Sequence, residues 1–277
     1  MTQLISRTTL VAFVALAGLL PAHAELNCRD SDYQGVFGAI AVGTFVSAPG
    51  IPPGPTVRVG RVESDGNGNA KIQATLSLNG LIIKEDYGGT YSIHPDCTMD
   101  VTLLIPFPGV PAPIPFKFSG ALADDGREAA IILLDPAGAD VRITLRKQRR
   151  EDCTNRDLSG SYLLNMAGSI ISREDSPAGF FGRVGRATFD GKGKFNALTQ
   201  ASYNGRMSRE TLTGVYEVDS SCQVTIAYTM GQLVTLNSVD DPRARKFAGM
   251  LTDDGAGVDV MESDPAGASI IGTLRQQ

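Results

Sequence analysis

The residues that could act as a base or a nucleophile are few in this chain. It has 277 residues and two histidines, and the first of these, His23, lies in a leader-like N-terminus. His94 stands beside Pro95 in a predicted loop, and Asp219 occupies the matching position later in the chain. A serine nucleophile needs a nearby base, and none is apparent. We therefore expect no catalytic residue and no cofactor.

The cysteines are the other reactive side chains, at Cys28, Cys97, Cys153 and Cys222. Their spacing fits no zinc motif, so we expect no metal site. An even number of cysteines in an exported chain favours disulfides. Four cysteines allow three pairings, and the choice among them depends on the fold.

An Asp-x-Asn-x-Asn run at 65–69 has the alternating oxygen ligands that open a calcium loop. The second half of the chain has Lys192 and Lys194 where two of those ligands would stand. A turn is therefore the expected role of this run.

The tetrapeptide Arg-Val-Gly-Arg occurs twice, at 58–61 and at 183–186. Arginines three residues apart on a strand point to opposite faces, unless the glycine marks a bulge. An arginine that points into a barrel needs a carboxylate partner or an anionic ligand. We expect structural ion pairs here, and Arg58 and Arg183 are also candidate ligand contacts.

A predicted export signal precedes the strands that are expected to position these residues. Arg7 precedes an apolar run from Leu10 to Leu20 and a small-x-small site that ends at Ala24, as in a secretory signal peptide. The run is shorter than the roughly 20 residues of a membrane span. We therefore expect a periplasmic or extracellular protein with no transmembrane segment. The net charge of −5 disfavours nucleic acid as a partner.

After the signal, the chain is a tandem repeat. Besides the Arg-Val-Gly-Arg motif, the Asn-Gly pair at 79–80 recurs at 204–205, and the segment 118–126 matches 247–255. Chance does not produce such a collinear series of matches. The predicted divisions are a signal peptide at 1–24, a first repeat at 25–149 and a second repeat at 150–277.

Each repeat has short β-branched segments separated by glycine-containing turns, which predicts an all-β fold. The Asn-Gly pairs favour type I′ hairpin turns. Eight consecutive hairpin-connected strands favour a closed barrel, because closure removes exposed edges. The predicted fold is therefore two tandem eight-stranded antiparallel meander barrels. In the first repeat the predicted strands lie near 34–47, 56–64, 70–78, 81–93, 98–106, 115–123, 127–135 and 139–147.

In such a barrel, the chain before the first strand and the turn after the fourth strand lie at the same end. Cys28 and Cys97 occupy these two places, and Cys153 and Cys222 occupy the matching ones. We expect one disulfide in each repeat, Cys28–Cys97 and Cys153–Cys222. Each would pin the segment that crosses the barrel floor.

The two repeats open with a Gly-x-aromatic triplet, at 35–37 and 160–162, and their last strands carry Arg146 and Arg275. This combination resembles the calycin superfamily, which contains the lipocalins, where an arginine packs over a tryptophan at the closed end of an eight-stranded barrel. This chain has Phe and Tyr instead, and it lacks the C-terminal helix of true lipocalins. The resemblance implies a binding cup, framed by the loops between strands one and two and strands five and six.

Two proline-rich stretches of the first repeat fall in those loops, at 48–55 and 105–115. Proline stiffens a loop, and Phe45, Phe107 and Ile114 give this end an apolar character. The loops are therefore either a preformed apolar mouth or docking surface, or rigid connections in solvent. The second repeat has polar loops in these places, so two sites would differ in chemistry.

These features favour an exported, non-catalytic binding protein that holds a small apolar ligand in a barrel or docks a partner through the proline-rich loops. A structural or surface-interaction protein is the first alternative. A barrel enzyme without histidine, of isomerase or cyclase type, is the second. An open apolar lumen would support ligand binding, and a lumen filled by its own side chains would support the structural role. A buried unpaired charge in an open lumen would support the enzyme.

Overall fold

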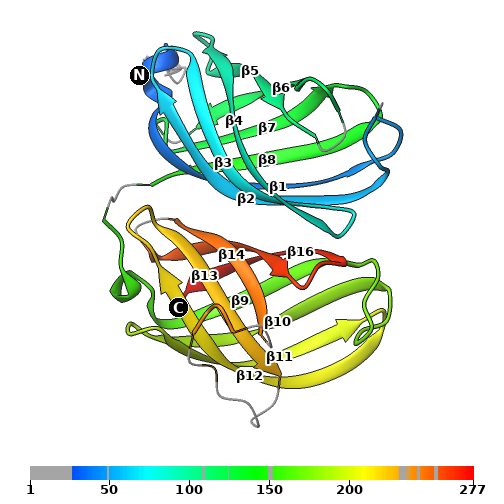
Figure 1. The fold of residues 1–277 in the computed structure, drawn as a ribbon. Helices are drawn as coiled ribbons and strands as arrows, with labels where there is room; N and C mark the ends of the chain where they lie inside the picture. The colour runs from blue at the N-terminus through cyan, green and yellow to red at the C-terminus, as the bar shows by residue number, and fades with distance from the viewer. Residues whose placement is uncertain are drawn as a thin grey trace, which may run out of the picture.

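The computed structural model describes residues 27–48, 50–107, 110–123, 125–148, 152–230, 236, 238–241, 244–252 and 255–277. The predicted signal peptide and the predicted divisions after residues 24 and 149 lie outside this part of the chain and stay predictions. Two β-barrels lie one above the other (Figure 1). No helix in the described ranges is long and apolar enough to cross a membrane.

Barrel one is a meander in which each strand pairs with the next and β8 closes on β1. A short 3-10 helix, η1 (Asp30–Tyr33), precedes it. Its strands are β1 (Gln34–Phe45), β2 (Gly54–Asp65), β3 (Asn69–Leu78), β4 (Leu81–Ile93), β5 (Thr98–Ile105), β6 (Ile114–Ala123), β7 (Glu128–Asp135) and β8 (Ala139–Lys147).

Barrel two repeats this meander after η2 (Asn155–Asp157), and β16 closes on β9. Its strands are β9 (Ser159–Ile170), β10 (Gly179–Asp190), β11 (Lys194–Tyr203), β12 (Arg206–Val218), β13 (Gln223–Met230), β14 (Arg245–Thr252), β15 (Gly257–Asp264) and β16 (Ala268–Gln276). The predicted fold of two eight-stranded antiparallel barrels, in the calycin-like architecture, is confirmed.

Each barrel has a floor, where its first strand begins and its fourth strand ends. The disulfides Cys28–Cys97 and Cys153–Cys222 lie there, so the predicted disulfide in each barrel is confirmed. The short helices η1 and η2 lie between the first cysteine and the first strand of each barrel. They occupy the floor, as the cysteine positions predicted.

The opposite end of each barrel is its mouth, which holds the loops after the first and fifth strands. Both mouths lie on the same side of the molecule, at the right in Figure 1. There the N–H of Gly267 in barrel two donates a hydrogen bond to the carbonyl of Gly80 in barrel one, at 2.8 Å. The two mouths therefore border on one another.

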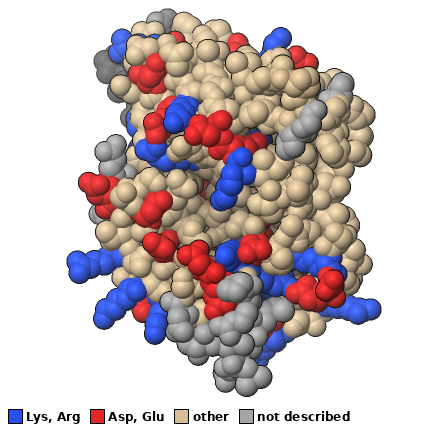
Figure 2. All heavy atoms as spheres, in the orientation of Figure 1, with Lys and Arg blue, Asp and Glu red and all other residues tan. Residues whose placement is uncertain are grey.

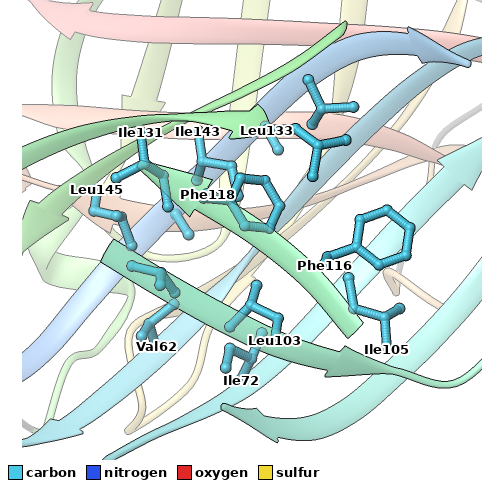
Figure 3. Close-up of a cluster of buried hydrophobic side chains, with 14 of the residues drawn as sticks. Val62, Ile72, Leu103, Ile105, Phe116, Phe118, Ile131, Leu133, Ile143 and Leu145 are labelled. Carbon is cyan, nitrogen blue, oxygen red and sulfur yellow. The ribbon is translucent and has the colours of Figure 1, made fainter. Parts of the chain in front are cut away.

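The alternation of side chains along the strands fills both lumina with apolar groups. In barrel one Leu103, Phe118, Ile131 and Ile143 come from different strands and point toward one another (Figure 3). Phe118 is only 2 % exposed. Burying such side chains stabilises a fold by roughly 1.5–3 kcal/mol each. Each barrel therefore has a core of its own.

The basic residue that meets the first strand's aromatic ring is not the one that the calycin resemblance implied. Lys147 lies over the ring of Phe37, with its Nζ 5.8 Å from the ring centroid. Arg146 is one residue earlier on β8 and points outward, as Arg275 does in barrel two. The assignment to Arg146 and Arg275 is wrong because successive strand residues face opposite sides of the sheet.

The outer faces of the two barrels pack together through a small apolar cluster. Val57 and Val59 of β2 contact Met250 of β14 and Met261 of β15. Beside this cluster, the Ser77 hydroxyl lies 2.8 Å from the carbonyl of Ala268. The two barrels therefore share a buried interface.

A carboxylate in this interface joins arginines of both barrels. Asp259 is 1 % exposed. Its Oδ2 accepts a hydrogen bond from Arg146 Nη1 at 3.3 Å, and its Oδ1 lies 3.5 Å from Arg275 Nη2. Arg146 and Arg275 occupy matching positions in the two repeats, and both contact Asp259. The matching position in the first repeat is Ala130.

Replacing Asp259 with asparagine should lower the free energy of unfolding by about 1.5–3 kcal/mol, the usual worth of hydrogen bonds to charged groups. Urea denaturation followed by tyrosine fluorescence measures this. The matched control is Asp135→Asn, which breaks an exposed pair with Lys117 and should cost less than about 1 kcal/mol. Equal losses in the two variants would show that Asp259 does not hold the barrels together.

Candidate functional site

The β1–β2 and β5–β6 loops meet across the mouth of barrel one. Ala48, Ile51 and Phe107 are buried and belong to the barrel's apolar core. A Cβ built on Gly50 would lie 4.0 Å from Cγ2 of Val110, so the two loops are in contact range. The loops therefore cover this mouth with their own apolar side chains.

Phe45 and Phe107 are part of this cover. Both rings lie beside Phe116, with centroids 6.3 Å and 5.7 Å away. Ile114 is half-buried and packs on the same core. The three aliphatic and aromatic residues predicted to line a mouth do lie together there, and they point inward.

The outer surface of the same mouth is largely apolar, and the exposed pair Lys117–Asp135 borders it. Val46, Leu104 and Leu134 are 68 %, 52 % and 62 % exposed, and neither proline-rich stretch contains a charged residue. Figure 2 shows this end of barrel one, at the upper right, as mainly uncharged side chains. We call this surface, with its exposed prolines, the proline rim. The exposed prolines are Pro52, Pro53, Pro106, Pro111, Pro113 and Pro115.

The lumen beneath the proline rim holds a cavity of about 40 Å³. That is room for about three water molecules at roughly 10–15 Å³ each. Arg58 lies at this cavity and donates to Glu85, from Nε to Oε2 at 2.5 Å and from Nη2 to Oε1 at 2.9 Å. The lumen is thus nearly filled, and its charges are paired.

Barrel two has the same ion pair in a larger network. Arg183 donates to Glu210 from Nε and Nη2, at 3.1 Å and 2.7 Å. It also donates to the hydroxyls of Tyr203 and Tyr228, each at 3.0 Å, and Tyr203 donates to Glu210 at 2.7 Å. The cavity beside Arg183 is about 20 Å³, so this lumen is filled as well.

The mouth of barrel two carries charges where barrel one carries prolines. Arg173 Nη1 lies 3.0 Å from Glu262 Oε1, and Arg245 pairs with both Glu262 and Asp175. Burial raises the pKa of the Glu262 carboxyl, and the arginines act in the opposite direction. The predicted chemical difference between the two mouths is therefore present.

One arginine of each Arg-Val-Gly-Arg motif points into its barrel, as expected from the alternation of a strand. The register of β2 runs unbroken through Gly60, so there is no bulge. A ligand-binding role for Arg58, Arg183, Phe45 and the other mouth residues stays a prediction.

Glu85 and Glu210, the partners of the lumenal arginines, were not predicted from the sequence. A sign of them was present, because both acids stand 27 residues after their arginines. An acid that recurs at a fixed distance from a recurring arginine is a usable signal for an ion pair that both repeats share.

No group of three or more metal-binding side chains occurs in the part of the chain that the structure describes. The Asp65 carboxylate instead accepts hydrogen bonds from the N–H groups of Asn67 and Asn69, at 2.7 Å and 3.0 Å. These bonds build the expected turn.

No protein-family model and no curated protein matches this chain. Among solved structures it is similar to the isotype 1 transferrin binding protein B from serogroup B Neisseria meningitidis. That likeness has 9 % identity, covers 88 % of this chain and 77 % of the other, and has a TM-score of 0.33. A protein of unknown function from the DUF3598 family of Nostoc punctiforme is similar at 13 % identity, with 90 % and 99 % coverage and a TM-score of 0.25. Both scores are low, so neither likeness indicates what this chain binds.

Proposed function

We propose that this chain is an exported, non-catalytic binding protein that docks a protein partner on the proline rim of barrel one. One observation carries the proposal. The two proline-rich loops close the lumen from above and at the same time present an uncharged, apolar surface to solvent. An exposed apolar surface of this kind is typical of an interaction site.

The small size of the cavities favours the outside of the barrels over the inside. The cavities of about 40 Å³ and 20 Å³ lie far below the roughly 300–1,000 Å³ of a small-molecule pocket. A lipid-like ligand would have to displace core side chains such as Phe107. Docking on the rim needs no such rearrangement.

The rim is also held in place before a partner arrives. Ile51 and Phe107 anchor the two loops in the core, and proline reduces the conformations that a free loop can adopt. A loop that is already ordered loses little entropy on binding. The proline-rich stretches carry no charge, and Lys117 and Asp135 at the border of the rim pair with each other. We therefore propose a partner with an apolar, uncharged surface, and we expect salt to weaken the binding little.

The disulfides support the export part of the proposal. Disulfide bonds persist in oxidising compartments such as the periplasm and the extracellular space, and each barrel has one. The predicted signal peptide at 1–24 agrees with such a location.

Photo-crosslinking in the native host tests the docking surface. A benzoylphenylalanine at Leu104 should form an adduct with a partner protein, whereas one at Phe180 should not. Phe180 is the matched control because it is apolar and 81 % exposed but lies on β10 of barrel two. The partner, once purified, should bind Leu104→Asp at least tenfold more weakly than wild type, since a charge would be buried unpaired, and should bind Phe180→Asp normally.

Two results would overturn the proposal. One is an adduct that forms from Phe180 and not from Leu104. The other is an adduct from Leu104 that contains only a second copy of this chain, which would make the rim a self-association surface.

A further inference from the structure

A cleft of about 230 Å³ lies between the two barrels. Strands β2, β3 and β4 form one wall, and β13 and β14 form the other (Figure 1). The barrels touch beside it, where Val57 and Val59 pack on Met250. The cleft is therefore bordered on one side by the interface that holds the barrels together.

The strand registers decide which side chains face the cleft. Thr75 of β3 pairs with Lys84 of β4, and one step further from the interface Gln73 pairs with Asp86. All four line the cleft, and Gln223 lines it from barrel two. Polar groups from two separate barrels thus converge on one space.

Lys84 is the distinctive group among them. Its Nζ donates to the Thr75 hydroxyl oxygen at 2.8 Å, which leaves the hydroxyl hydrogen of Thr75 available to donate. No carboxylate within ion-pair distance of Lys84 is found among the described residues. Burial lowers the pKa of the Lys84 ammonium. Lys84 is exposed to solvent, yet it lines the cleft and is held by the buried Thr75. A cation fixed in a cleft without a counterion is a favourable place for an anion.

The acids around the cleft are already engaged elsewhere. Glu85 borders the cleft, but its carboxylate turns into the lumen and pairs with Arg58. Asp86 accepts from Gln73 at 3.2 Å and lies 3.9 Å from Lys71. Neither carboxylate neutralises Lys84.

We propose that this cleft binds a small organic anion, with Lys84 as the partner of its carboxylate. Thr75 donates to the same group, and the Gln223 amide contacts polar atoms of the ligand from the facing barrel. The Met250 side chain and the backbone of Gly60 form the less polar part of the wall. The volume of about 230 Å³ has room for about 15–23 water-sized groups at roughly 10–15 Å³ each, so it admits a polar molecule of a dozen or more non-hydrogen atoms.

Gluconate and sorbitol form a suitable pair of probes, because they differ only in that a carboxylate replaces a hydroxymethyl group. In full-length protein labelled with ¹³C-lysine, gluconate should shift the Lys84 Cε resonance saturably, with a Kd below about 1 mM. Sorbitol should bind at least tenfold more weakly. Saturation with gluconate should also raise the pKa of Lys84, because a bound carboxylate stabilises the ammonium form.

Two variants test whether gluconate binds in the cleft or is attracted only by the overall charge of the protein. Lys84→Met should weaken gluconate binding at least tenfold by calorimetry, and Gln223→Ala should weaken it severalfold from the other wall. Lys117→Met is the matched control, because Lys117 lies on β6 and pairs with Asp135; it should leave binding unchanged. A linear, non-saturating shift, equal binding of sorbitol, or equal loss in Lys117→Met would each overturn the proposal.

Discussion

Replacing Arg183 with methionine should lower the free energy of unfolding by about 3–5 kcal/mol, the usual cost of removing one partner of a buried ion pair. The Arg183 side chain is 1 % exposed and that of Glu210 is 9 % exposed. Without the guanidinium, Glu210 would keep a hydrogen bond from Tyr203 but no cation. Urea denaturation followed by tyrosine fluorescence measures the loss, since the chain has no tryptophan.

Three variants show whether this loss comes from the unpaired carboxylate. Arg183→Met combined with Glu210→Gln should recover part of the stability, because the buried charge is then gone. Arg58→Met should cost at least as much as Arg183→Met, because the Glu85 side chain that it leaves unpaired is 2 % exposed, against 9 % for Glu210. Arg186→Met alters the exposed arginine of the same motif and should stay within about 0.5 kcal/mol of wild type. A loss below about 1 kcal/mol for Arg183→Met would mean that solvent reaches the pair.

The ion pairs also mark the limit of what the sequence could predict. Strand alternation was enough to place Arg58 inside the barrel, but its partner is not on a neighbouring strand. Glu85 pairs in register with Ala74, and Ala74 pairs with Gly60. The Arg58–Glu85 contact therefore runs diagonally across β3. Hairpin turns fix only the register of adjacent strands, so a contact across an intervening strand has to come from the closed barrel.

Small side chains make room for that diagonal contact. A Cβ on Gly60 would lie 2.6 Å from the Cβ of Ala74, which is closer than two non-bonded carbon atoms can approach. In barrel two Gly185 takes the same place, where a Cβ would lie 2.7 Å from the Cα of Thr199. The glycine of Arg-Val-Gly-Arg was predicted as a possible bulge, and its role is this close approach between strands.

The proline-rich loops show a second limit of prediction from the sequence, which concerns the direction of loop side chains. Their place at one end of barrel one followed from counting strands, and it is correct. The inward turn of Ile51 and Phe107 did not follow, because loops lack the two-residue period that assigns strand residues to a face. The contact with the Phe37 ring was predicted at Arg146 but is made by Lys147, one residue later. A shift of one position exchanges the two faces of a strand.

Replacing Cys28 and Cys97 with serine should lower the free energy of unfolding by about 4 kcal/mol, and replacing Cys153 and Cys222 should have nearly the same effect. The sequence separation is 69 residues in both cases, and the chain-entropy model makes the loss depend on loop length. Each double variant is thus the matched control of the other. Urea denaturation in the absence of reductant measures both.

The two losses of unfolding free energy are equal only if each barrel floor keeps its folded structure without its disulfide. The hydrogen bonds of the floors indicate that it does. In barrel one Asp30 Oδ1 accepts from the N–H of Ile93 at 2.6 Å, and in barrel two Asn155 Oδ1 accepts from Val218 at 2.7 Å. Each floor helix therefore stays attached to the end of the fourth strand, and the disulfide acts mainly on the unfolded chain. Losses that differ by more than about twofold would show that one floor depends on its disulfide for its folded structure.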